Sequence, residues 1–207
     1  MKKIIAFMFC FFLLGNVCFA DDYETGHAIG SAIGAALGGT PGVDDKAFYK
    51  DDHYDFSKLK KICVMAMIPK NSGAYVTDPY IHIKYNKIAQ EELKDIIRVI
   101  PITDVISAFQ KTTNYQLLDE KERPAAFKSY LASNYQALLN VNIYAYRQNG
   151  NIGDVFLDFT LTDLASGKNV MYYKDMRLKA PRSWKEGMIK RITGAFGEKL
   201  EDAIKKK

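Results

Sequence analysis

From Phe56 onward, the spacing of apolar residues predicts one compact domain of strands and helices. Residues 61–68 are almost continuously apolar and end before a proline, which is typical of a strand buried on both faces. Residues 155–162 alternate between apolar positions on one face and mainly polar positions on the other, which predicts a half-buried strand. Because side chains two residues apart point the same way, Leu157 and Phe159 are expected to face the core.

Apolar residues at helical spacing predict four helices in the same region. The first is expected to begin at Asp78, whose side chain can cap a helix that has proline in its first position. A short helix is expected after Thr103, and a third begins at Pro124. The last helix begins near Ser183 and carries an apolar stripe as far as Ala203.

The remaining apolar runs predict three further strands, at residues 97–101, 138–146 and 169–178. The last is expected to pair with strand 155–162 across a polar turn. The order is therefore β-α-β-α-α-β-β-β-α, with parallel neighbours early and antiparallel hairpins late. The predicted fold class is α/β (α+β): a small mixed sheet of about five strands with helices packed against it, over residues 58–207.

Residues 1–20 have the parts of a secretory signal peptide: two lysines, an apolar stretch and a small-residue cleavage site. Cys18 and Ala20 fit cleavage after Ala20, and an uncleaved anchor is the alternative. The two cysteines in this region follow Phe9 and Val17, which are too large for lipoprotein processing. The mature protein is therefore expected to be exported, periplasmic or envelope-associated, and not a lipoprotein.

The N-terminal segment 21–42 resembles a glycine zipper. Four glycines recur every four residues, which puts them on one stripe of a helix: Gly26, Gly30, Gly34 and Gly38. Two interpretations stay open, a loose tether of small residues and a helix over 26–38 that pairs with itself or lies at a membrane. A phosphate-binding loop is not expected, because the glycines are not followed by the required lysine.

Residues 43–57 carry several aspartates and few aliphatic residues, so they are predicted to form an acidic linker. The chain has a net charge of +5, which falls to +3 when the two signal lysines are removed. This charge is small and scattered, so no nucleic-acid partner is expected.

The sequence lacks the motifs of common enzymes. None of the serine-hydrolase, zinc-protease or dithiol motifs occurs, and Cys63 has no histidine at a spacing typical of a nucleophile. The expectation is therefore a non-enzymatic protein with no cofactor or metal, with a hydrolase of diffuse site as the less favoured alternative. Three tyrosines in or beside predicted loops are candidate contact residues, because aromatic rings anchor interfaces: Tyr75, Tyr80 and Tyr115.

Three features support a family resemblance: the apolar strand that ends at Pro69, the segment Ala137-Leu138-Leu139, and the Asp-x-x-Ser-Gly turn at residues 163–167. With these features and this element order, residues 58–205 resemble the periplasmic α/β domains of the curli-secretion protein CsgG, the penicillin-binding-protein activator LpoB and the N-terminal part of TolB. The connection at 148–153 is too short for a pore-forming hairpin. The resemblance implies a non-enzymatic envelope protein that binds partners.

The functional hypothesis is an exported cell-envelope protein that acts as a binding or adaptor module for other envelope proteins. The alternative is a self-associating or membrane-associated assembly component that uses the glycine stripe over 26–38.

Overall fold

Six strands and four α-helices are present in the computed structural model, which describes residues 48–112, 115–149, 152–181 and 185–206. The strands are β1 (Phe48–Lys50), β2 (Lys61–Met67), β3 (Arg98–Pro101), β4 (Ala137–Asn149), β5 (Ile152–Asp163) and β6 (Asn169–Pro181). The helices are α2 (Ile81–Leu93), α3 (Ile102–Gln110), α4 (Arg123–Asn134) and α5 (Lys185–Lys205), with 3-10 turns η4 (Phe56–Lys58), η5 (Lys70–Tyr75) and η6 (Tyr115–Leu117).

The strands form one mixed sheet in the order β1-β6-β5-β4-β2-β3. β2 runs parallel to both β3 and β4, whereas β4, β5, β6 and β1 are antiparallel to their neighbours. The predicted mixed α/β sheet and the predicted order of elements from β2 to α5 are confirmed.

The sixth strand is the difference from the predicted sheet of about five strands. β1 lies within residues 43–57, which the sequence assigns to a linker, and pairs with residues 171–173 of β6. Three residues are too few to show the alternation that identifies a strand. Aromatic contacts hold β1 in place, since the Phe48 ring meets Tyr173 at 5.5 Å and the Tyr49 ring stacks on Tyr172 at 4.9 Å.

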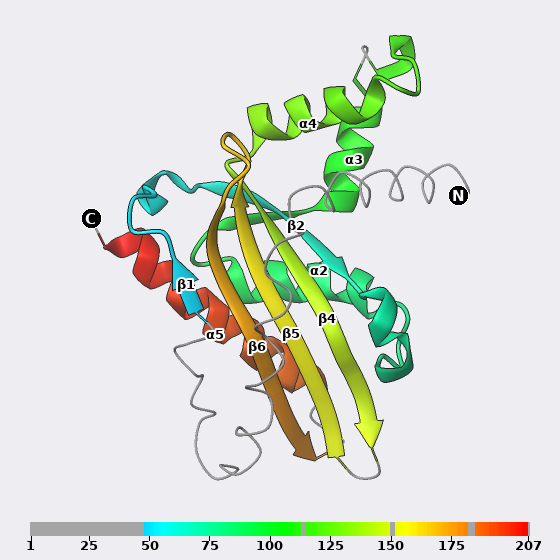
Figure 1. The fold of residues 1–207 in the computed structure, drawn as a ribbon, viewed down its shortest axis with the longest axis vertical. Coiled ribbons are helices and arrows are strands. Elements are labelled where there is room, and N and C mark those ends of the chain that lie inside the picture. The colour runs from blue at the N-terminus through cyan, green and yellow to red at the C-terminus, as the bar shows by residue number, and fades with distance from the viewer. Residues whose placement is uncertain (1–47, 113–114, 150–151, 182–184, 207) are drawn as a thin grey trace.

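One face of the sheet is covered by α2 and α5, which lie behind the strands in Figure 1. Leu157 and Phe159 are fully buried on this face, as predicted from the alternation. The Phe159 ring stacks on Phe196 of α5, with ring centroids 4.8 Å apart. The two helices pack closely because α5 has Gly197 at their contact, where a Cβ atom would lie 2.9 Å from Leu93 Cδ2.

On the opposite face of the sheet, the described elements cover one end only. There α3 and α4 bury Cys63 and Leu138 in a second apolar cluster, so β2 is buried on both faces as predicted. Further along, β4, β5 and β6 extend beyond these helices toward the lower end of Figure 1. We call the far parts of these strands, residues 143–149, 152–157 and 176–181, the arm.

Two helix starts differ from those expected. The Asp78 carboxylate accepts a hydrogen bond from the backbone N–H of Tyr80 at 3.0 Å, and α2 begins after Tyr80. α3 begins at Ile102 directly from β3, so Thr103 lies inside its first turn. The glycine stripe, the signal region and Ser183 lie outside the described residues.

The Phe159 contact gives a test of the core. We expect Phe159→Ala to lower the free energy of unfolding by about 3–5 kcal/mol, because it removes a buried ring that α5 packs on. Leu117→Ala, at a side chain 84% exposed, is the control and should change stability by less than about 0.5 kcal/mol. Urea unfolding measures both, and a loss below about 1 kcal/mol for Phe159→Ala would contradict the packing described here.

Candidate interaction surface

A buried carboxylate organises the end of the arm. Asp154 on β5 is 3% exposed, and both of its oxygens accept hydrogen bonds from Arg177 on β6, at 2.8 Å to Oδ1 and 2.7 Å to Oδ2. Arg147 on β4 approaches from the other side, with Nε 3.5 Å from Asp154 Oδ2. Two guanidinium groups from two strands are therefore held around one carboxylate.

These contacts set the protonation of the cluster. Burial by itself would raise the pKa of Asp154, but the hydrogen bonds and charge of Arg177 outweigh it and hold this pKa below its usual range. The hydrogen bonds to Asp154 raise the pKa of Arg177 in turn. The carboxylate is therefore ionised at neutral pH and binds Arg177 as a two-point ion pair.

Arg147 has weaker partners than Arg177. Its guanidinium lies over the Tyr75 ring, 4.4 Å from the ring centroid. Its Nε is buried and has no hydrogen-bond acceptor among the described residues. The guanidinium is thus held by an aromatic ring and a 3.5 Å ionic contact, with donor capacity left over.

The segment after η5 joins one of the predicted tyrosines, Tyr75, to the arm. The backbone N–H of Thr77 donates to the Tyr146 carbonyl at 3.0 Å, which fixes Tyr75 beside Arg147. Tyr80 follows as the N-cap residue of α2 and is 65% exposed, and Ile83 lies one turn further on and is 54% exposed. We define the arm-end surface by Tyr75, Arg147 and Arg177; Tyr80 and Ile83 flank it, on the chain that leads from Thr77 into α2.

Tyr115, the third predicted tyrosine, does not join this surface. It lies in η6, between α3 and α4 at the opposite end of the sheet in Figure 1, and is half-buried against Phe109 at a centroid distance of 5.4 Å. The glycines Gly26, Gly30, Gly34 and Gly38 lie outside the described residues, so their role stays a prediction.

The charged residues of the arm were not among the sequence-predicted candidates. Arg147 and Asp154 pair across the β4–β5 hairpin, a register that a short turn near residue 150 would have indicated. Arg177 could not be placed this way, because irregular pairing between β5 and β6 shifts their register and puts Lys179 opposite Asp154.

A second carboxylate with a shifted pKa, that of Asp158, lies on the face of the sheet opposite α2 and α5. Asp158 on β5 accepts a hydrogen bond from the backbone N–H of Asp175 at 2.8 Å, where β6 bulges and Asp175 has a φ of 59°. Burial raises the pKa of Asp158 to about 6, although the Asp175 N–H favours the ionised form. Tyr144 and Phe156 lie on the same face with ring centroids 4.9 Å apart.

This carboxylate predicts a pH-dependent effect on stability. In the unfolded chain Asp158 should titrate near pH 3.9, so between pH 4 and 6 folding takes up a proton and wild-type stability falls as pH rises. Asp158→Asn removes this penalty while keeping an acceptor for Asp175. We expect the variant to unfold within about 0.5 kcal/mol of wild type at pH 4 and to be more stable by about 1–3 kcal/mol at pH 7.

Urea unfolding at both pH values measures the difference. Thr160→Ala, on the same face without a titrating group, should shift stability equally at both pH values. A pH-independent gain for Asp158→Asn would show that charge burial is not its cause.

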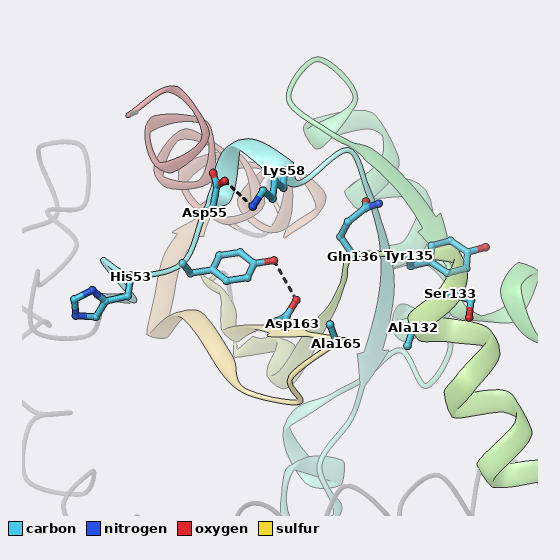
Figure 2. Close-up of a pocket in the computed structure, with 10 residues that line it drawn as sticks. His53, Asp55, Lys58, Ala132, Ser133, Tyr135, Gln136, Asp163 and Ala165 are labelled. Atoms are coloured by element: carbon cyan, nitrogen blue, oxygen red, sulfur yellow. Dashed lines mark hydrogen bonds and ion pairs between the residues drawn. The ribbon is translucent and has the colours of Figure 1, made fainter.

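A shallow pocket of about 450 Å³ lies at the other end of the sheet, between the loop before η4, the end of α4 and the β5–β6 turn (Figure 2). Its polar groups already have structural partners. Asp163 accepts from the Tyr54 hydroxyl at 3.3 Å and from the Ser166 backbone N–H at 2.7 Å, and Gln136 Oε1 accepts from the Lys61 N–H at 2.8 Å. Figure 2 shows His53 pointing away from this group, so the pocket lacks a converging reactive set.

The described ranges lack two kinds of feature. These residues contain no group of three or more His, Cys, Asp or Glu side chains placed to hold a metal ion. Within the same ranges, no helix is both long and apolar enough to cross a membrane.

Neither a protein-family model nor a curated protein matches the chain. Among solved structures, the chain is similar to the PelC dodecamer from Paraburkholderia phytofirmans, with a TM-score of 0.50 and 15% identity over 74% of this chain and 94% of that one. It also matches lipoprotein GNA1162 from Neisseria meningitidis (TM-score 0.42, 12% identity, 67% and 99% covered). A third match is the LpoB C-terminal domain from Salmonella enterica (0.39, 11%, 64% and 88%).

At these identities the likeness to PelC shows a shared fold and nothing more specific. LpoB, one of the three proteins in the sequence resemblance, is among the matched structures. The resemblance to CsgG and TolB stays a prediction.

Proposed function

We propose that the chain is an exported, non-enzymatic protein of the bacterial cell envelope that binds partner proteins through the arm-end surface. The observation that carries this proposal is the half-buried Arg147 guanidinium, held over the exposed Tyr75 ring. Arginine and tyrosine are the residue types that dominate the energetics of protein interfaces. The predicted signal peptide supports export, and a lipid anchor is not part of the proposal.

Binding accounts for the arm better than catalysis does. Asp154 is already paired with Arg177, and the other charged groups beside it, Arg147 and Lys179, are cationic. An acid–base site needs titratable groups that converge on an open position where a substrate atom can sit. A hydrolase with a diffuse site would have to place such a group elsewhere, and the pocket of Figure 2 does not supply one.

Site-specific photo-crosslinking tests this proposal. A photo-reactive residue at position 80 should give discrete crosslinked partners in intact cells, because this exposed side chain follows the segment that Thr77 joins to the arm. The same residue at position 117, which is 84% exposed on η6, is the matched control and should give none of these bands. Ile83→Ser should weaken the bands from position 80, and equal bands from both positions would contradict a specific surface.

The alternative function is self-association through the glycine stripe over 26–38, or membrane attachment by the same residues. The four-residue spacing of glycines favours this alternative, and so does the fold shared with a protein that forms a dodecamer.

Removal of residues 21–42 tests the alternative. If the stripe drives assembly, the mature chain should be an oligomer by light scattering and the truncated chain a monomer with the same melting temperature. Equal masses and unchanged envelope association after truncation would leave the stripe as a tether.

A further inference from the structure

The arm-end surface has the chemistry of a receptor for carboxylates. An arginine carries five N–H donors in a planar fork and cannot lose its charge near neutral pH. Arg177 donates two hydrogen bonds to Asp154. Arg147 makes only an ionic contact of 3.5 Å with the same carboxylate, and its Nε has no hydrogen-bond acceptor among the described residues. The terminal N–H groups of the partly exposed Arg147 are therefore free to bind an acceptor from a partner.

We propose that the partner presents an acidic protein segment to this surface, with a glutamate or aspartate side chain bound by Arg147. This inference rests on the proposed function and names the chemistry of its partner. The Tyr75 ring and the β4 strand hold the guanidinium before the partner arrives, so little side-chain entropy is lost on binding.

The charge balance around Arg147 favours an anion. Lys179 lies opposite Asp154 on β6, so three cations surround one carboxylate that is already paired. Asp78, in the segment before α2, is bound to Lys84. Glu186 in the first turn of α5 pairs with Lys190.

The same fold contains a second arginine–tyrosine pair that lacks this property. Arg123 stacks on Tyr115 with a centroid distance of 4.8 Å, close to the 4.4 Å of Arg147 on Tyr75. However, Arg123 Nε donates to the Leu118 carbonyl at 3.2 Å, so this donor is satisfied within the chain. Both arginines stack on a tyrosine, but only Arg147 has an Nε donor without an acceptor in the part of the chain that the structure describes. A difference between variants of the two arginines would therefore reflect the unused donors and not the stacking.

The burial of Arg147 favours an acidic side chain over a lipid headgroup. Its side chain is 27% exposed and that of Arg177 is 40% exposed, so both are partly buried. A bilayer surface attracts clusters of fully exposed lysines, whereas a carboxylate on a flexible side chain can reach a recessed guanidinium.

A fluorescein-labelled hexaglutamate peptide serves as the probe, and fluorescence anisotropy measures its binding to the mature chain, residues 21–207. We expect Arg147→Gln to weaken binding about tenfold and Arg147→Lys to weaken it less, because lysine keeps the charge but loses the fork. Arg123→Gln is the matched control and should bind as wild type does. Thermal melting checks that each variant is folded; Asp154 keeps Arg177 as its partner in all of them.

Three outcomes would overturn the inference. Equal losses in Arg147→Gln and Arg123→Gln would show non-specific charge attraction. Binding to phosphatidylglycerol vesicles but not to the peptide would assign the surface to lipid, and competition by inorganic phosphate at the peptide's own concentration would assign it to a small anion. If none of these probes binds while position 80 still crosslinks to a partner, the acidic-segment inference fails and the proposed function stands.

Discussion

Burial of one face of β5 under α5 is the constraint from which the rest of this structure follows. Leu157 and Phe159 are fully buried there, and the Phe159 ring stacks on Phe196. Because a strand alternates its side chains, this burial forces Asp154, Phe156 and Asp158 onto the opposite face. The residues that give the arm its chemistry are therefore placed by the core on the other side of the sheet.

The charged side chains of the arm lie on a face of the sheet that no described helix covers at this end. Asp154 is nonetheless almost fully buried, because Arg177 and Arg147 close over it from the two neighbouring strands. A buried carboxylate left without such partners would be costly, so the arginines are needed for the fold as well as for any contact. This dual role explains why the exposed tyrosine and isoleucine, not Arg177, are the better positions for probing partner binding.

The bulge in β6 determines which groups surround the two carboxylates Asp154 and Asp158. Asp175 adopts a positive φ, and its N–H points at Asp158 instead of continuing the ladder. The bulge also shifts the register that follows by one residue, which puts Lys179 rather than Leu178 directly opposite Asp154. One irregular residue thus decides which cations surround the carboxylate at the arm end.

The sequence by itself determined the elements whose signals are local. The alternation in β5, the continuous apolar run of β2 and the helical stripes of α2 and α5 identify their own burial, since periodicity reports which face of an element meets the core. Tyr75 and Tyr80 are exposed, as the sequence predicted, and their role in binding a partner stays a prediction.

Tertiary structure alone decided the position of β1, which depends on aromatic contacts with β6 more than 120 residues away. It also decided that Arg147, Asp154 and Arg177 meet, because their contact depends on two hairpin registers and on pairing irregularities that no local pattern encodes.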